Sequence, residues 1–525
     1  MSWIRANSDK LFLGAFLPVL LFFVIQRVDS GDGLRHLGHI LSSNRPALGE
    51  PRWILFPVLL FAVIKPFVVV GAVQTTAQAT RIFGFFNALC SFGYLVCLRR
   101  WLMDLSPLRR TAVLLLAGGS YVFLSLATDT IEPTPAVLIA VAGITFARFR
   151  VGLSDIARVT IAAASIMLAA LIYQGILFGF FFLPAVFPVP VLATRRAVLR
   201  VLGLALCAPL VTVALLTWSG DTPRNSLRRF LKGEANDAAS SEYSKPSARS
   251  LAGVAIVGPA YAFASIPERR GLAGSARLLR QWTTAAEGIR GLAAWACMAI
   301  AIAGAIVLLI VRKQAALLIA FIGMMALPAI RISQYSYVKY YALLPLLVVL
   351  IVPKLGIRFI YPALLGALLL VSNLWQIRLQ RVQFDAVQTQ AARELYPRVP
   401  EGSCFLSSGW GLPVPGWPGD SLAWMHILAG GSAQSQESLA KMNSQQLRGR
   451  LRKLFCSCPA VVTDTFIQPN APSLQEQLSS YHIADLPLPE ILVSEPKPAA
   501  VFRSSKFTAY RFSSDDQHRA CEALD

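Results

Sequence analysis

The stretch from Leu11 to His39, LFLGAFLPVLLFFVIQRVDSGDGLRHLGH, joins an apolar run to a polar segment that carries acidic residues and histidines. An ionisable segment beside a membrane helix is costly to place there and usually has a function. If the segment is helical from Asp32, then Asp32, His36 and His39 lie on one face of that helix. The competing interpretation is an amphipathic interfacial helix whose polar side faces water.

The composition predicts a membrane protein. Of the 525 residues, 55% are hydrophobic and 15% are charged, which is typical of a chain with many membrane spans. The net charge of +21 arises before Gln376, because residues 376–525 contain 14 Lys and Arg against 14 Asp and Glu. A nucleic-acid-binding protein would carry the basic excess on a soluble surface, so that class is excluded.

Length, flanking charge and helix breakers predict a polytopic α-helical membrane protein of about 11 spans, with the N-terminus inside and the C-terminus outside. The first span is expected to be retained, because no small-residue cleavage site follows it. The apolar runs 53–73, broken by Lys65 and Pro66, and 251–266 are expected to enter the membrane without crossing it. The predicted spans are 11–25, 80–98, 111–127, 134–146, 159–173, 175–192, 198–218, 291–311, 315–330, 340–352 and 357–375.

The predicted spans carry almost no ionisable residues in their middle parts. Lys65 and Arg81, near the early loops, are the exceptions. Ion-coupled transporters usually bury ionisable groups along their pathway. The pattern therefore favours chemistry at one membrane surface over transport through the membrane.

Residues 376–525 are predicted to form a small soluble α/β domain outside the cytoplasm, after a transmembrane domain that comprises residues 1–375. Short apolar runs at 403–407, 460–463 and 506–512 alternate with helical stretches such as 384–395. Outside the cytoplasm, its four cysteines could form one or two disulfides, with the pairing open: Cys404, Cys456, Cys458 and Cys521. The other four lie in apolar runs and are expected to be buried packing residues: Cys90, Cys97, Cys207 and Cys297.

Under this topology, three groups of polar residues share the outer membrane surface. They are Asp29, Asp32, His36 and His39 in the first loop, Asp129 and Glu132 in a later loop, and the segment Arg331–Tyr341. A carboxylate can take the proton from an attacking hydroxyl, and a lysine or arginine can stabilise a departing phosphate. The combination suits a transfer reaction with a phosphate leaving group.

These residues resemble the motifs of the GT-C superfamily, membrane glycosyltransferases that use polyprenyl-phosphate sugars as donors. In that family the first outer loop carries a catalytic aspartate. Asp32-Gly33-Leu34-Arg35-His36 is similar to one version of this loop, followed downstream by a proline and aromatic segment, here Glu50-Pro51-Arg52-Trp53. The stretch Asp29-Ser30-Gly31-Asp32 is similar to another version, in which Asp29 would be catalytic.

The resemblance continues along the membrane part. Arg81 and Arg99-Arg100 match arginines at the two ends of the family's second span, and Asp129 to Glu132 resembles its second acidic motif. The segment Lys339-Tyr340-Tyr341-Ala342-Leu343-Leu344-Pro345 resembles a late motif whose basic residue meets the donor phosphate. The Asp-Glu dipeptide of some branches is absent, so the branch and the sugar stay open.

The resemblance implies an inverting glycosyltransferase of the bacterial cytoplasmic membrane, acting from a polyprenyl-phosphate sugar on a glycan, lipid or protein acceptor outside the cytoplasm. Asp32 or Asp29 would be the catalytic base. Some members of the superfamily use a divalent metal and many do not. If this chain uses one, Asp32, Asp129 and Glu132 could hold it. The alternatives are a lipid-linked glycan ligase or polymerase and a lipid or glycan flippase. The expected substrate-binding residues are His36, His39, Glu50, Arg52, Asp129, Glu132, Arg331, Tyr337, Lys339 and Tyr340.

Overall fold

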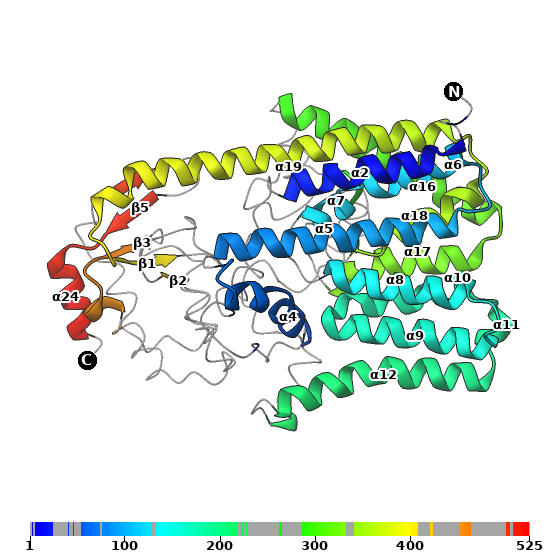
Figure 1. Cartoon of the computed structure of the whole chain (residues 1–525), viewed down its shortest axis with the longest axis horizontal. Coiled ribbons are helices and arrows are strands. Elements are labelled where there is room, and N and C mark those ends of the chain that lie inside the picture. The colour runs from blue at the N-terminus through cyan, green and yellow to red at the C-terminus, as the bar shows by residue number, and fades with distance from the viewer. Residues whose placement is uncertain are drawn as a thin grey trace.

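The structure is a computed structural model of the whole chain, and it consists of a helical bundle with a small sheet at one end (Figure 1). It describes residues 3, 6–24, 40, 46, 54–73, 76–128, 133–218, 222–224, 227, 262–264, 286–331, 341–407, 421–423, 452, 454–463, 500–503 and 508–523. Within these residues, four helices are long and apolar enough to cross a membrane, or five if one bent pair counts as a single span. Six shorter apolar helices accompany them, so the chain has the architecture of a multi-pass membrane protein.

A buried ion pair fixes how the first helices run. Helix α2 (Ser8–Val24) begins beside the end of α5 (Thr76–Trp101) and the start of α6 (Pro107–Gly119). The Asp9 carboxylate accepts hydrogen bonds from Arg99 Nε at 2.6 Å and from Arg110 Nη1 at 2.7 Å. The helices α2 and α5 are therefore antiparallel, and we call the end of the bundle at Asp9 the arginine end.

Helix α8 (Pro133–Phe149) also ends at the arginine end, because Trp101 Nε1 donates to Thr145 Oγ1 at 2.9 Å. Helix α9 (Asp155–Ile172) starts there, with Ser154 as its N-cap, and runs back beside α8. Their contact is close, because Gly143 leaves room for the side chain of Ser165. Each of these two helices agrees with a predicted span.

The predicted span 111–127 is wrong as a single helix. It consists of α6 and α7 (Tyr121–Thr128), which meet at Ser120 with a bend of 65°. At the bend α6 touches the long helix α19 (Ile360–Glu394), because a Cβ on Gly119 would lie 2.7 Å from the carbonyl oxygen of Gly366. Small residues allow two helix backbones to approach this closely.

The predicted span 175–192 is also wrong as a single helix. Residues Gln174–Phe182 form a 3₁₀ helix, η1, which is followed by the short helices α10 (Leu183–Val186) and α11 (Val189–Leu192). Prolines at 184, 188 and 190 prevent one continuous helix, because proline lacks the amide that the helix needs. Helix α12 (Arg195–Trp218) then follows, as predicted, on the outside of α9 (Figure 1).

Helix α4 (Phe56–Val69) continues through Lys65 and Pro66, so the predicted break in this run is wrong. It lies at the end of the bundle nearer the strands, beside α5, where the rings of Phe56 and Phe83 pack edge to face (Figure 1). The remaining elements of the bundle are α16 (Ala286–Val311), α17 (Ala315–Arg331), α18 (Leu344–Ile351) and the 3₁₀ helix η5 (Val352–Leu355). Helix α18 begins four residues later than the predicted span at 340, and 251–261 and 265–266 lie outside the described residues.

Helix α19 connects the bundle to the sheet. It packs parallel to α6, because Gly366 lies against Leu116 and Leu370 lies against Gly119. It therefore starts at the arginine end and leads away from it to the strands, without a break at 375. The separate helix predicted at 384–395 is the last part of α19.

The sheet has five strands in the order β2-β1-β3-β5-β4. Strand β1 (Cys404–Ser407) pairs in parallel with β2 (Ser421–Ala423) and β3 (Val461–Thr463), whereas β5 (Thr508–Arg511) is antiparallel to β3 and to β4 (Ala500–Arg503). A short 3₁₀ helix, η6 (Tyr396–Arg398), precedes the sheet and α24 (Ser514–Ala523) follows it. The strands predicted at 403–407, 460–463 and 506–512 are confirmed as β1, β3 and β5.

All four cysteines near the sheet are oxidised. Cys404 pairs with Cys458, and Cys456 pairs with Cys521, so both of the expected disulfides form. The four remaining cysteines are free. Of these, Cys90 is buried as predicted and Cys97 and Cys207 are half-buried. Cys297 is exposed, so its predicted burial is wrong.

Candidate functional site

The end of the bundle opposite the arginine end, which we call the sheet end, is where the predicted groups of polar residues enter and leave the described structure. Helix α2 ends there at Val24, whose side chain reaches Gly84 near the start of α5. Helices α7 and α8 meet there across residues 129–132, since α8 ends at the arginine end. Helix α17 starts beside Arg312, whose Nη1 donates to the carbonyl oxygen of Lys354 near the start of α19, and so it ends at the sheet end with Arg331.

The side chains of the predicted site residues lie outside the part of the chain that the structure describes. Arg331 is the last residue of α17, but its side chain is also outside. The structure therefore supplies the frame around these residues, and their roles stay predictions. They are Asp29, Asp32, His36, His39, Glu50, Arg52, Asp129, Glu132, Tyr337, Lys339 and Tyr340.

The first loop is anchored on both sides of its proline and aromatic segment. Ile40, the residue after His39, is buried and its carbonyl oxygen accepts a hydrogen bond from Lys65 Nζ at 3.3 Å. Leu55, shortly after Arg52, donates its amide to the carbonyl oxygen of Leu171 at the end of α9, at 2.9 Å. Lys65 lies on α4, so this helix fixes the position at which the chain leaves the histidine-bearing segment.

The second loop is closed by one buried hydroxyl. Thr134, in the first turn of α8, is 4% exposed, and its Oγ1 donates to the carbonyl oxygen of Leu126 on α7 at 2.7 Å. The hydroxyl of Thr128 donates to Leu124, one turn earlier in α7. The bond from Thr134 joins the two sides of the loop that carries Asp129 and Glu132, so it fixes the distance between the loop's ends.

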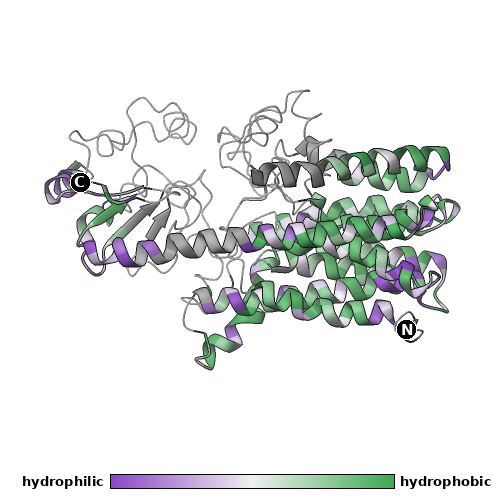
Figure 2. Cartoon of the chain, turned by 90° about the horizontal axis from the view of Figure 1, so that it is seen from above, coloured by the Kyte–Doolittle hydropathy of each residue, from purple (hydrophilic) through white to green (hydrophobic). Residues whose placement is uncertain are grey.

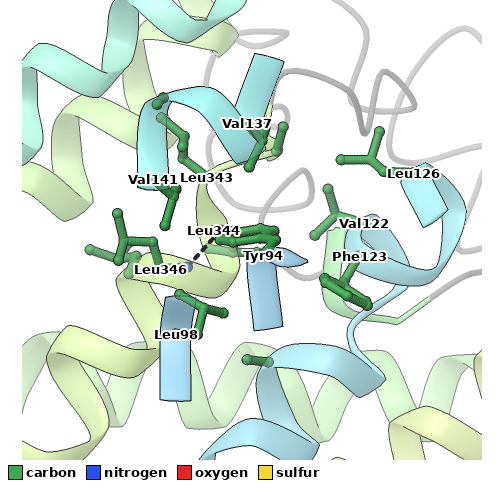
Figure 3. Close-up of a cluster of buried hydrophobic side chains, with 14 of the residues drawn as sticks. Tyr94, Leu98, Val122, Phe123, Leu126, Val137, Val141, Leu343, Leu344 and Leu346 are labelled. Carbon is green, nitrogen blue, oxygen red and sulfur yellow. Dashed lines mark hydrogen bonds between the residues drawn. The ribbon is translucent and has the colours of Figure 1, made fainter. Parts of the chain in front are cut away.

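The third segment is anchored by a tyrosine from α5 (Figure 3). Tyr94 is buried, and its hydroxyl oxygen accepts a hydrogen bond from the amide of Leu346 at 3.0 Å. Leu346 lies in the first turn of α18, and its amide is shared between the tyrosine hydroxyl and the carbonyl oxygen of Leu343, at 3.1 Å. Tyr341, two residues after Lys339, is 2% exposed. From Tyr341 onward the chain therefore lies in the core and is held there.

The three anchors share one design, in which a side chain bonds to a backbone group. The anchoring residues are Lys65, Thr134 and Tyr94. The sequence interpretation noted Lys65 only as an interruption in an apolar run, and the other two carry no motif. Of the three anchors, only Lys65 could have been recognised from the sequence. A lysine within an apolar run needs a polar partner, and this one has the carbonyl oxygen of Ile40.

The described residues offer no metal site: no three of their His, Cys, Asp or Glu side chains gather. Asp32, Asp129 and Glu132, the predicted candidates for a metal, all lie outside this part of the chain. Carboxylate oxygens are suitable ligands for a hard divalent cation, and this is the reason for the metal prediction, which stays a prediction.

No family model and no curated protein matches the chain. Two crystal structures of ArnT from Cupriavidus metallidurans resemble it, one in the apo state and one bound to undecaprenyl phosphate. Each has a TM-score of 0.39, at 13% and 12% sequence identity, and the alignments cover 96% of this chain and 98% of the other. A likeness at this level does not assign a function by itself.

Proposed function

We propose that the chain is a membrane glycosyltransferase that moves one sugar from a polyprenyl-phosphate donor to an acceptor hydroxyl, with inversion at the anomeric carbon. One observation carries the proposal. Described residues next to all three predicted groups lie at the same end of the bundle, the sheet end: Val24, Thr134 and Arg331. Lys65 and Thr134 anchor the first two segments there, and Tyr94 anchors the third deeper in the bundle. Groups that arrive from three distant parts of the sequence can thus belong to one site.

The reaction would use the predicted residues in complementary roles. The carboxylate of Asp32, or of Asp29, takes the proton of the acceptor hydroxyl as its oxygen attacks the anomeric carbon. The bond from that carbon to the phosphate oxygen breaks, and polyprenyl phosphate leaves. Lys339, with Arg331, stabilises the charge on the leaving phosphate. Asp129 and Glu132 position the acceptor or a divalent metal.

The orientation belongs to the same proposal. Arg99, Arg100, Arg109 and Arg110 gather at the arginine end, where Figure 2 shows hydrophilic residues, and basic residues favour the cytoplasmic side of a membrane. Disulfides persist in oxidising compartments, and the two disulfides beside the sheet suit the extracytoplasmic side. Both observations support a multi-pass protein of a bacterial cytoplasmic membrane, with the sheet and the site outside.

The orientation is tested by thiol labelling of intact cells. Single cysteines replace Asp32, Asp129, Lys339 and, as a marker at the arginine end, Asp104, in a background that keeps the four disulfide cysteines and lacks the four free ones. The first three are expected to react with a membrane-impermeant maleimide from outside, and the marker only after the membrane is opened. If Asp129→Cys or Lys339→Cys instead labels with the marker, one shared site is impossible and the flippase alternative gains.

The chemistry is tested with purified protein and a panel of synthetic polyprenyl-phosphate monosaccharides, measuring release of polyprenyl phosphate in the presence of membrane extract as acceptor source. Asp32→Asn or Asp29→Asn is expected to lower the rate by at least about 100-fold, the loss of a general base. Asp104→Asn, at the other end of the bundle, is the control and should keep the rate. Full activity in both variants would remove the proposed mechanism, and a chain that acts only on oligosaccharide donors would be the ligase.

A further inference from the structure

We propose that the arginines where α8, α9 and α12 meet at the arginine end form a binding site for anionic phospholipid headgroups, with the acyl chains lying along α12. The site is at the opposite end of the bundle from the proposed reaction and does not depend on it. Residues 133–218 contain six arginines and a single carboxylate, that of Asp155. All six lie within one or two turns of this corner.

Contacts between the helices place three of these arginines around the first turns of α9. Arg158 Nη2, on α9, donates to the carbonyl oxygen of Arg150, just after α8, at 3.2 Å. Arg200 Nη1, on α12, donates to Thr160 Oγ1 on α9 at 3.1 Å. Like charges repel, so a negative charge from outside the chain would stabilise these arginines beside their single carboxylate.

The single carboxylate leaves much of this charge uncompensated. Asp155 Oδ1 lies 3.6 Å from Arg158 Nη1, and its side chain is 59% exposed. The Nε of Arg158 is buried and has no hydrogen-bond partner among the described residues. Arg195 and Arg196, at the start of α12, are exposed. A phosphate group offers several acceptor oxygens and a negative charge, and therefore fits this set of donors.

The surface that continues from these arginines is apolar. Along α12, Arg195 is followed on one face by Leu199, Leu202, Leu206 and Leu210, which are 59%, 55%, 60% and 67% exposed. Figure 2 shows hydrophilic residues at the ends of the long helices near the N-terminus and hydrophobic residues beyond them. A cationic patch that heads an apolar stripe matches a lipid, whose charged headgroup precedes its acyl chains. Inorganic phosphate would match the arginines but not the stripe.

The test uses the full-length protein in neutral detergent and compares phosphatidylglycerol with phosphatidylcholine. The readouts are the shift in Tm and the retained lipid in native mass spectrometry. Phosphatidylglycerol should raise Tm and be retained, whereas phosphatidylcholine should do neither, and the difference should shrink as salt increases. The triple variant R195Q/R196Q/R200Q should lose at least about 10-fold of the preference, because each basic residue near anionic lipid adds roughly a five-fold preference.

A matched control removes the same charge elsewhere at this end of the bundle: R109Q/K354Q/R358Q changes three exposed basic residues outside the corner and should keep the preference. If the two triple variants lose it equally, the effect is general electrostatics and the site is refuted. It is also refuted if the wild-type protein binds both lipids equally, or if inorganic phosphate at the same concentration reproduces the rise in Tm. If R195Q/R196Q/R200Q does not fold, the proposal is tested with R195K/R196K/R200K and with the comparison of the two lipids on the wild-type protein. Lysines keep the positive charge, so the lysine variant should keep the preference for phosphatidylglycerol.

Discussion

The carboxylate oxygen Oδ2 of Asp9 lies 2.6 Å from Nε of Arg99, which follows it by 90 residues. The same oxygen lies 2.7 Å from Nη1 of Arg110. The Asp9 side chain is 1% exposed, and the arginine side chains are 23% and 12% exposed. Three helices thus meet at one buried charge, which sets the directions of α2, α5 and α6 and hence the end at which the predicted site segments emerge.

Asp9→Asn should destabilise the bundle. The substitution leaves two partly buried guanidinium groups without their counter-charge, at a cost of about 2–4 kcal/mol, at the lower side of the range for buried pairs because the arginines retain some contact with water. Thermal unfolding in detergent measures the effect as a fall in Tm. Asp104→Asn, at an exposed position of the same end, should leave Tm nearly unchanged. Equal Tm values for the two variants would show that the ion pair does not hold these helices.

Gly366→Ala should separate α6 from α19. A Cβ at this position would lie 2.6 Å from the backbone nitrogen of Leu116, and backbone cannot yield as a side chain can. Overpacking of this kind costs about 1–3 kcal/mol. Gly304→Ala in α16 is the matched control, because nothing lies within 4 Å of its added Cβ, and alanine there should be neutral or slightly stabilising. A fall in Tm for both variants alike would contradict the proposed close contact.

Cys404→Ser should break one disulfide and expose one specific new thiol, that of Cys458. Cys456→Ser should likewise release Cys521. The loops closed by these bonds span 54 and 65 residues, and a disulfide that closes a loop of this length contributes up to about 4 kcal/mol. Alkylation followed by peptide mass spectrometry identifies the released thiol. Cys297→Ser, which removes an exposed free thiol, should alter neither the disulfides nor the stability.

The sequence predicts the parts of the fold that depend on local composition. Short apolar runs located β1, β3 and β5, and apolar length located α9 and α12. The bend between α6 and α7 was not predicted, although Gly118-Gly119-Ser120 lies at it and Gly/Ser pairs are common kink sites in helices. The strands β2 (Ser421–Ala423) and β4 (Ala500–Arg503) were not predicted, and they form the two edges of the sheet.

The candidate site divides in the same way. Charged residues in outer loops are conspicuous in a chain with 15% charged residues, so the sequence could nominate Asp32, Asp129 and Lys339. Their supports could not be nominated. Tyr94 and Thr134 bond to backbone atoms, and any residue could supply a backbone amide or carbonyl. Such pairings become visible only when the folded chain brings the partners together.

Tyr94→Phe tests one of these supports. It removes the hydroxyl that accepts the amide of Leu346 and leaves the ring in place, so we expect a loss of about 1 kcal/mol of stability. Because Leu346 follows Lys339 closely, the variant should also weaken donor binding in the release assay more than it lowers the maximal rate. Tyr361→Phe, at a position 60% exposed on α19, is the control for loss of a tyrosine hydroxyl. Unchanged donor binding in Tyr94→Phe would separate this bond from the function of Lys339.

Thr134→Val tests the closure of the loop that carries Asp129 and Glu132. Valine has nearly the shape of threonine but cannot donate to the carbonyl oxygen of Leu126, so that buried oxygen loses a partner at a cost of about 1–2 kcal/mol. A cysteine introduced by Asp129→Cys reports on the loop through its rate of reaction with a maleimide, and Thr134→Val should raise that rate, because the loop ends are no longer joined. Thr217→Val removes a comparable hydroxyl, one that donates to Val213 within α12, and should leave the rate unchanged. An equal rate with threonine and valine at 134 would mean that the helices alone hold the loop, and that the hydroxyl contributes to stability without ordering the acidic residues.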